Sequence, residues 1–199
     1  MRSKYIIGID EVGRGPLAGP VAVGVFAVER KKAKKILKRA NDSKKLSEKK
    51  REEIFAEMSQ CAKSLDCFYN VSLVSAKIID SKGITFAIKN GIKKSLEKVL
   101  CEIKIKAGDV EVLLDGSLSA PTEFTHQKTI IKGDSLEPVI GMASIMAKVT
   151  RDRYIQRIAK KYPNYGFEIH KGYGTLMHRK NIEKFGVCDI HRKSWVKGV

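Results

Sequence analysis

The chain has 199 residues and carries 39 Lys and Arg against 22 Asp and Glu, a formal net charge of +17. This length suits one domain with a sizeable core, and no apolar run approaches the ~20 residues of a membrane-spanning helix. So large a positive excess is typical of proteins that bind a polyanion, nucleic acid first and an anionic membrane surface second, although a generally lysine-rich proteome would give the same bias.

The cysteines exclude the usual zinc motifs. Cys61, Cys67, Cys101 and Cys188 form no CxxC pair, and no histidine is spaced to complete a zinc site. We interpret them as small buried apolar residues in a reducing compartment. Residues 1–4 lead directly into a strand-like run with no signal peptide. We therefore expect a cytoplasmic protein without a membrane partner.

The first half of the chain is expected to open with a pair of strands. Residues 4–10 predict a strand, and the Val-rich residues 20–28 predict a second one, antiparallel to the first across a short loop. Apolar residues at helical spacing predict a helix over 30–39 with a solvated basic face. Residues 41–46 form a polar turn, after which Ser47 is predicted to cap the next helix.

The second half alternates strands with longer helices. Residues 65–74 predict a third strand, and apolar residues three or four positions apart predict a helix over 84–99. Further strands are expected at 110–116 and 125–132, followed by a long helix over 138–160 that starts near a proline.

The order of these elements predicts an α/β fold with a mixed central sheet and helices on both faces. We expect a single domain over 1–199, on which the loop-rich tail, 161–199, packs as an extension with a short helix at 175–185. If the fourth strand lies parallel to the first, acids at their carboxyl ends share one edge of the sheet, where open α/β sheets place their sites.

The first strand ends in two adjacent carboxylates, Asp10 and Glu11. Successive strand residues face opposite ways, but Gly13 and Gly15 allow the backbone to leave the pleat so that both acids converge. Like charges held together raise each other's pKa unless a cation neutralises them. We interpret this stretch as a metal-binding strand end with Arg14 beside it; the alternative is an ordinary turn with a salt bridge from Glu11 to Arg14.

Two further acids follow later strands, Asp115 and Asp134. With Asp10 and Glu11 they form an all-oxygen set, which selects Mg²⁺ or Mn²⁺. Two such ions about 3.5–4 Å apart support phosphodiester hydrolysis. Either residue could instead belong to a turn, and Asp134 could cap a helix. Asp152 is a rival fourth ligand, although its arginine neighbours at positions 151 and 153 favour a structural ion pair.

Tyr173 and Lys44 are candidate substrate-binding residues. The glycines beside Tyr173 favour an exposed ring, and the alternative is a core aromatic residue under a loop. Lys44 is interpreted as a solvated side chain, with phosphate contact as the alternative. The histidines are assigned structural or phosphate-facing roles, because metal-bound water requires no histidine base.

These residues fall in an ordered set of motifs that covers nearly the whole chain and closely resembles type 2 ribonuclease H, ribonuclease HII. The motifs are DEVGRGPLAGP (10–20), NDSKKLS (41–47), LLDG (113–116), IKGDS (131–135), ASIMAKVTRD (143–152), HKGYGT (170–175) and HRKS (191–194). The departures are Trp195, where the family has Phe, and Gly174, where Pro is frequent.

The resemblance implies a ribonuclease H fold with a five-stranded sheet. It also implies an endonuclease that cleaves RNA in RNA–DNA hybrids and incises 5′ of single ribonucleotides in duplex DNA, leaving 3′-hydroxyl and 5′-phosphate ends. In the family, the four carboxylates hold the metal ions, the loop backbone contacts the ribose 2′-hydroxyl and the tyrosine stacks at the junction sugar. The resemblance assigns the carboxylate role to Asp10, Glu11, Asp115 and Asp134. It assigns the loop role to Gly13, Arg14 and Gly15, and the stacking role to Tyr173.

Two other functions are weighed against this one. A non-catalytic basic RNA- or ribosome-binding module would match the composition, but it gives no reason for acids at three strand ends. A type 3 ribonuclease H would share the acids, yet the short sequence before the first strand leaves no room for the additional N-terminal domain of that type. We expect a monomer of type 2.

Overall fold

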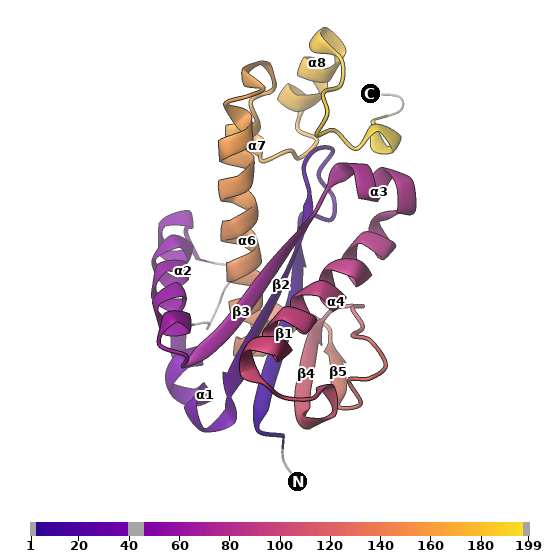
Figure 1. Ribbon diagram of the computed structural model, residues 1–199. Helices are drawn as coiled ribbons and strands as arrows, with labels where there is room; N and C mark the ends of the chain where they lie inside the picture. Colours follow the sequence, from indigo (N-terminus) through magenta and orange to yellow (C-terminus); the bar gives the residue numbers. More distant parts are fainter. Residues whose placement is uncertain (1–2, 40–45, 197–199) are drawn as a thin grey trace.

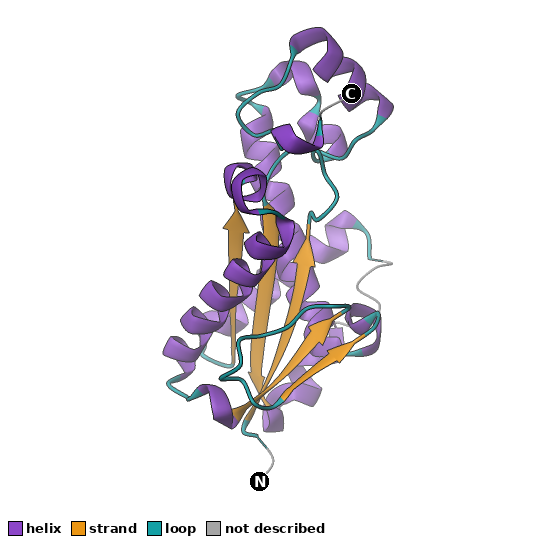
Figure 2. Cartoon of the chain, turned by 90° about the vertical axis from the view of Figure 1, so that its right-hand side faces the viewer, coloured by secondary structure: helices purple, strands orange, loops and turns teal. Residues whose placement is uncertain are grey.

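The computed structural model describes residues 3–39 and 46–196 and contains a five-stranded sheet of order β3-β2-β1-β4-β5 (Figures 1 and 2). The strands are β1 (Tyr5–Val12), β2 (Val21–Glu29), β3 (Cys67–Val74), β4 (Val110–Asp115) and β5 (Gln127–Ile130). Strands β1, β2 and β3 pair antiparallel, whereas β4 and β5 run parallel to β1. The predicted mixed sheet is therefore confirmed.

Helices cover both faces of the sheet. They are α1 (Arg30–Ile36), α2 (Glu48–Lys63), α3 (Ala76–Lys82), α4 (Ile84–Ile103), α5 (Gly133–Leu136), α6 (Pro138–Ala159), α7 (Phe167–His170) and α8 (Leu176–Phe185), with 3₁₀ turns η1 (Leu37–Arg39), η3 (Ala107–Asp109), η4 (Pro163–Tyr165) and η5 (Lys193–Trp195). Helix α4 lies on one face and α6 with α2 on the other, while α7, α8 and η5 lie together beyond one end of the sheet (Figure 1). None of the helices in the described ranges is long and apolar enough to cross a membrane.

Alternation along β1 divides the core into two layers. Ile7 and Ile9 are fully buried in the layer that contains Ile92 and Leu96 of α4. Gly8 faces the opposite way, and a Cβ there would lie 2.2 Å from the Val139 carbonyl oxygen of α6. Because strand side chains repeat every two residues, Asp10 lies on the same face as Gly8, which is the face that α6 covers.

The register of the strands brings the acids together. Asp10 pairs with Gly24 of β2, and Ile9 pairs with Leu114 of β4, so that Asp115 at the end of β4 is next to Asp10. The carboxyl ends of parallel strands meet at one edge, as the sequence predicts.

Most predicted elements are confirmed, with shifts at their ends. Ser47 caps α2 by accepting a hydrogen bond from the Lys50 amide at 3.2 Å. The predicted helix over 30–39 ends as an α-helix at Ile36, and the one over 84–99 extends to Ile103. The short helices α3, α5 and α7 were not predicted, because four to seven residues carry too little periodicity. Residues 41–45 of the predicted polar turn lie outside the described residues.

The prediction that all the cysteines are buried is confirmed only for Cys67 in β3. Cys61 and Cys188 are half-buried, and Cys101 is exposed on α4. Cys101 follows Leu100 at a helical position that turns away from the sheet, so that its neighbours Val99 and Ile103 take the buried positions.

Replacement of Gly24 by alanine is expected to destabilise the fold by about 1–3 kcal/mol, the usual range for overpacking. A Cβ there would lie 2.3 Å from the Ala143 carbonyl oxygen, and helix backbone cannot move aside cheaply. Urea denaturation measures the loss. The matched control is Gly108→Ala, where a Cβ meets no atom within 4 Å; equal stability of the two variants would contradict the close packing of α6.

Candidate active site

The four predicted acids, Asp10, Glu11, Asp115 and Asp134, line one cavity of about 470 Å³ at the carboxyl ends of β1 and β4. Its wall also includes Gly13, Arg14, Gly15, Tyr173, Ser144, Lys148 and Arg51. A cavity of similar volume, about 530 Å³, lies elsewhere, beside Arg30 and Glu111. Volume therefore does not distinguish the two, and it is the convergence of carboxylates that makes the first cavity the candidate site.

Asp10 is buried, with 6% of its surface exposed. Its Oδ1 accepts a hydrogen bond from the Glu11 amide at 2.8 Å, and Ser144 of α6 also bonds to it. The pKa of Asp10 is raised from 3.8 to about 7, chiefly by burial and also by the charges of Glu11 and Asp115, while the hydrogen bond from Ser144 acts in the opposite direction. Asp10 is thus a carboxylate that a nearby cation would readily ionise.

Glu11 forms the salt bridge that was the structural alternative for this stretch. Arg14 Nε lies 2.9 Å from its Oε1, and the Glu11 side chain is 13% exposed. Burial nevertheless raises the pKa of Glu11, against the lowering effect of Arg14. The salt bridge to Arg14 is therefore confirmed, and Glu11 also borders the cavity, so the ion pair leaves the metal-binding interpretation open as a prediction.

Asp115 and Asp134 are joined through the backbone. The Asp134 amide donates to Asp115 Oδ1 at 3.4 Å, and Asp134 is 3% exposed in the first turn of α5. The α5 helix follows Lys132, which adopts a left-handed conformation with φ of 57°. A Cβ at Gly133 would lie 2.7 Å from Ile140 Cδ1 and 3.4 Å from Asp115 Oδ1, so this turn packs closely against β4 and α6.

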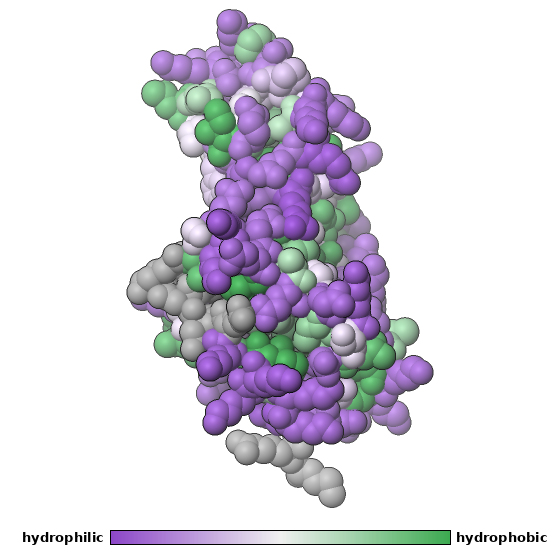
Figure 3. Space-filling view, turned by 90° about the vertical axis from the view of Figure 1, so that its left-hand side faces the viewer, coloured by the Kyte–Doolittle hydropathy of each residue, from purple (hydrophilic) through white to green (hydrophobic). Residues whose placement is uncertain are grey.

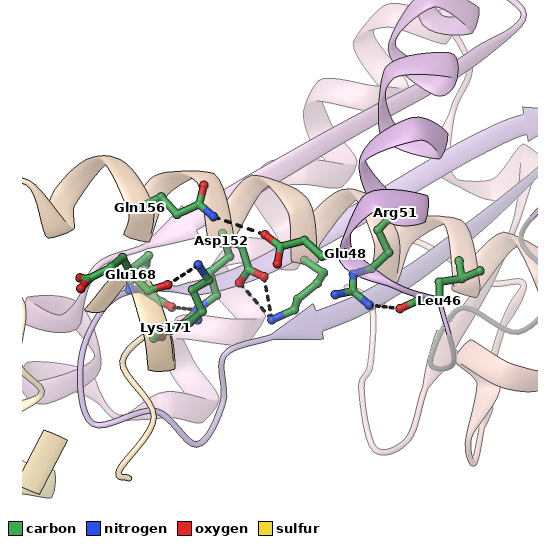
Figure 4. A network of polar contacts seen from close by, with 10 residues as sticks. Leu46, Glu48, Arg51, Asp152, Gln156, Glu168 and Lys171 are labelled. Carbon is green, nitrogen blue, oxygen red and sulfur yellow. Dashed lines mark hydrogen bonds and ion pairs between the residues drawn. The ribbon is translucent and has the colours of Figure 1, made fainter. Parts of the chain in front are cut away.

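Asp152 does not line the cavity. The structural ion pair that we expected does exist, but the predicted partners are wrong: Asp152 bonds Lys148, four residues earlier on α6, at 2.9 Å (Figure 4). Arg153 pairs with Glu52 of α2 instead, and Arg151 points inward to backbone carbonyls. The i,i+4 spacing favours the lysine. Lys44 lies outside the described residues.

Tyr173 has the exposed ring that its glycine neighbours predict, with 41% of its surface accessible at the edge of the cavity. Gly172 before it has φ of 87°, and a Cβ there would lie 2.4 Å from the Ala18 carbonyl oxygen. The turn therefore holds Tyr173 close to the β1–β2 loop.

Three further residues line the cavity that were not predicted to do so: Arg51, Ser144 and Lys148. Ser144 and Lys148 are four residues apart on α6, so they lie on one helix face, and this spacing of polar residues in an apolar helix was a usable signal. Arg51 comes from α2 and also donates to the Leu46 carbonyl oxygen (Figure 4). Its approach depends on how α2 packs against α6, which no local pattern shows.

The donors around the cavity fit a hard divalent cation. All four acids supply oxygen, the type that Mg²⁺ and Mn²⁺ prefer, and the raised pKa of Asp10 and Glu11 records repulsion and burial that a cation would relieve. The carboxylates surround the space without meeting at a point: in the described ranges, no three Asp, Glu, His or Cys side chains already form a ligand set.

The strand order and the helices on both faces define the ribonuclease H-like fold, which solved structures share. The ribonuclease H2 from Pyrococcus horikoshii OT3 has a TM-score of 0.72 at 26% identity, over 96% of this chain and 93% of that one. Bst-RNase HIII in complex with Mn²⁺ has a TM-score of 0.67 at 19% identity, over 93% of this chain and 64% of that one.

Sequence comparison gives the family. The model of the family described as "Ribonuclease HII" matches residues 7–198. Ribonuclease HII of Caldicellulosiruptor bescii is 43% identical over 98% of this chain and 88% of its own length, and that of Ruminiclostridium cellulolyticum is 44% identical over 98% and 71%. The chain belongs to the ribonuclease HII family. It is an endoribonuclease, a hydrolase of the RNA in RNA–DNA hybrids.

The raised pKa of Asp10 predicts how stability depends on pH. Between about pH 4 and 7 the folded state keeps a proton that the unfolded chain has released, so this group's contribution to stability is full below pH 4 and falls as pH rises. At about 1.4 kcal/mol per pKa unit, Asp10→Asn should gain a few kcal/mol over the wild type between pH 4 and 8.

The measurement is denaturant unfolding of both proteins in EDTA at a series of pH values. A difference between them that stays constant with pH would show that Asp10 titrates normally.

Proposed function

We propose that this protein hydrolyses the RNA strand of RNA–DNA hybrids and incises 5′ of single ribonucleotides in duplex DNA, leaving 3′-hydroxyl and 5′-phosphate ends. The observation that carries the proposal is that four carboxylates, the Gly13–Arg14–Gly15 backbone and an exposed tyrosine border the same cavity. The carboxylates supply a site for phosphodiester chemistry, and the loop and the tyrosine supply a surface that can read a sugar.

Asp10, Glu11, Asp115 and Asp134 would hold Mg²⁺ or Mn²⁺. Two such ions would supply an activated water and neutralise charge on the leaving oxygen. The chain's own cations, Lys148 and Arg51, border the same cavity and can bind the non-bridging oxygens of phosphates. Lys44, within the predicted polar turn over 41–46, is proposed as a further phosphate contact.

Recognition of ribose would fall to the loop after β1. Gly13 has φ of 88°, and a Cβ at Gly15 would meet no atom within 4 Å, so this backbone is open to a substrate on that side. The 2′-hydroxyl distinguishes RNA from DNA, and backbone amides without side chains can approach it closely. Tyr173 would stack on the sugar at the junction.

The partner is nucleic acid, which the charge of +17 suits. Hydrophilic side chains cover most of the face that carries α1 and α2, with smaller hydrophobic areas between them (Figure 3). We propose that the chain acts in the cytoplasm as a monomer, with residues 1–199 as one catalytic domain.

Asp10→Asn is expected to abolish cleavage, by at least about a thousandfold, while leaving hybrid binding largely intact. The variant removes a metal-binding charge but none of the basic side chains that bind phosphate. Cleavage of a labelled RNA–DNA hybrid with Mg²⁺, with a chelator arm, measures the first effect, and binding in EDTA measures the second. A fully active Asp10→Asn protein would rule out the assignment.

Tyr173→Ala is expected to slow incision at a single embedded ribonucleotide about tenfold more than it slows cleavage of a continuous RNA–DNA hybrid. Stacking on one sugar matters most where only one ribose identifies the site. For comparison, stacking of a base on an aromatic side chain contributes about 1–3 kcal/mol. Single-turnover rates on matched duplexes test this. Tyr173→Phe keeps the ring and is the control; equal losses on both substrates would contradict a sensing role.

A further inference from the structure

Two fully buried arginines, Arg151 of α6 and Arg192 just before η5, lie beneath the loop that follows β1. Neither forms an ion pair with any carboxylate in the described part of the chain. A buried charge is costly unless hydrogen bonds compensate it, and here both guanidinium groups bond almost entirely to backbone carbonyls of this loop and its surroundings. Burial lowers the pKa of Arg192 to about 10, which leaves it charged at neutral pH.

Arg192 holds two consecutive peptides of the glycine loop. Its Nη2 donates to the Gly13 carbonyl at 2.6 Å, its Nη1 to the Arg14 carbonyl at 2.7 Å, and its Nε to the Gly19 carbonyl at 3.1 Å. A guanidinium is planar and presents its donors in a fixed fork. The Trp195 ring, 4.8 Å from Cζ, packs on the same group. The directions of these carbonyls are therefore set by a rigid group.

The orientation of a carbonyl fixes that of the next amide. In a trans peptide the C=O and N–H bonds point to opposite sides, and the described chain contains no cis peptide. Because the Gly13 and Arg14 carbonyls face Arg192, the N–H groups of Arg14 and Gly15 point away from it. Neither N–H donates a hydrogen bond to another residue in the ranges that the structure describes. Both residues border the cavity.

Arg151 supports the loop from α6. It donates to the carbonyls of Pro20, Ala18 and Lys171 at 2.9, 3.3 and 3.0 Å. A Cβ at Gly13 would lie 2.2 Å from Arg151 Nε, so Gly13 packs directly on this side chain. The loop is thus held by two guanidinium groups, that of Arg151 on α6 and that of Arg192 just before η5.

Arg192 is itself held in place by α3. Asp80 accepts hydrogen bonds from the Lys193 amide at 2.8 Å, the Ser194 amide at 3.1 Å and the Ser194 hydroxyl at 2.5 Å. The Arg192 amide also donates to the Leu17 carbonyl at 2.8 Å. Figure 1 shows η5, near the C-terminus, beside α3.

We propose that Arg192 is a positioning residue for ribose recognition: it orients the two peptides after Gly13 so that the N–H groups of Arg14 and Gly15 can donate to a ribose 2′-hydroxyl. This inference rests on the proposed function, and it assigns part of the specificity to a residue of the C-terminal extension that does not itself border the cavity.

Arg192→Lys tests the proposal, because lysine keeps the charge and loses the fork. The readout is binding in EDTA to a DNA duplex with one ribonucleotide and to the same duplex without it. Wild type should prefer the first, and Arg192→Lys should lose about tenfold of that preference, or about 1.4 kcal/mol, with unchanged affinity for the all-DNA duplex. The matched control is Arg30→Lys, an arginine that donates to the Ser3 carbonyl at 2.9 Å, away from the cavity.

Chemical rescue separates positioning from folding. In Arg192→Ala, methylguanidinium should restore the preference for the ribonucleotide duplex, and methylammonium should not, since only the former has the planar donors. Asp80→Ala removes the hydrogen bonds that hold η5 and should lower the preference about threefold. This variant provides the test if thermal denaturation shows that the Arg192 variants are not folded.

The outcomes distinguish a failure of the role of Arg192 from a failure of ribose recognition itself. A folded Arg192→Lys with full preference, or Asp80→Ala with full preference where the former does not fold, would overturn the role of Arg192 alone. A wild-type protein with no preference for the ribonucleotide duplex would overturn ribose reading in the proposed function, and this inference with it.

Discussion

The concentration of buried negative charge at the end of β1 is the constraint on which the rest of the site depends. Asp10 is buried beside Glu11 and Asp115, and its pKa of about 7 expresses how unfavourable the ionised cluster is without a cation. Ser144 offsets part of this by hydrogen bonding. In a chain of net charge +17, the four carboxylates concentrate negative charge in one cavity, and Arg14, Arg51 and Lys148 on the same wall offset part of it.

The sheet and α6 create that cluster by close backbone contact. Parallel pairing of β1 with β4 brings Asp115 next to Asp10, and Gly8 and Gly24 let α6 approach the sheet until its carbonyls nearly touch these strands. Only at that distance does Ser144 reach Asp10. Packing that would elsewhere serve stability alone here affects the protonation of a carboxylate in the candidate site.

Sequence reasoning gave the strands, the long helices and the acids, because each follows from a local pattern. Hydrophobic alternation marks β1, and the placement of Asp10 and Asp115 at strand ends needs only the parallel pairing to bring them together. The partner of Asp152 was wrong because adjacent arginines in sequence point to different sides of a helix. Arg51 borders the cavity and Arg192 contacts the loop beside it, both through packing over long sequence separations that a single sequence does not reveal.

The C-terminal extension is part of the site rather than an appendage to it. His178 Nδ1 donates to the Tyr173 carbonyl at 2.9 Å, so its Nε2 accepts a hydrogen bond from His191 Nε2 at 3.1 Å, and His191 Nδ1 accepts the Cys188 amide at 2.8 Å. The imidazoles of His178 and His191 are therefore both neutral, because an added proton on either would place two donors against each other.

Burial agrees with this assignment, since it lowers the pKa of His178 to about 4 and also lowers that of His191. The next residue, Arg192, is a fully buried charge, and its carbonyl partners lie in the loop after β1. The neutral His178 holds the Tyr173 carbonyl, and the charged Arg192 holds the Gly13 carbonyl. Both parts of the proposed substrate-facing surface are therefore held by residues of the extension. The shape of a loop at the start of the chain is therefore determined by residues near its end.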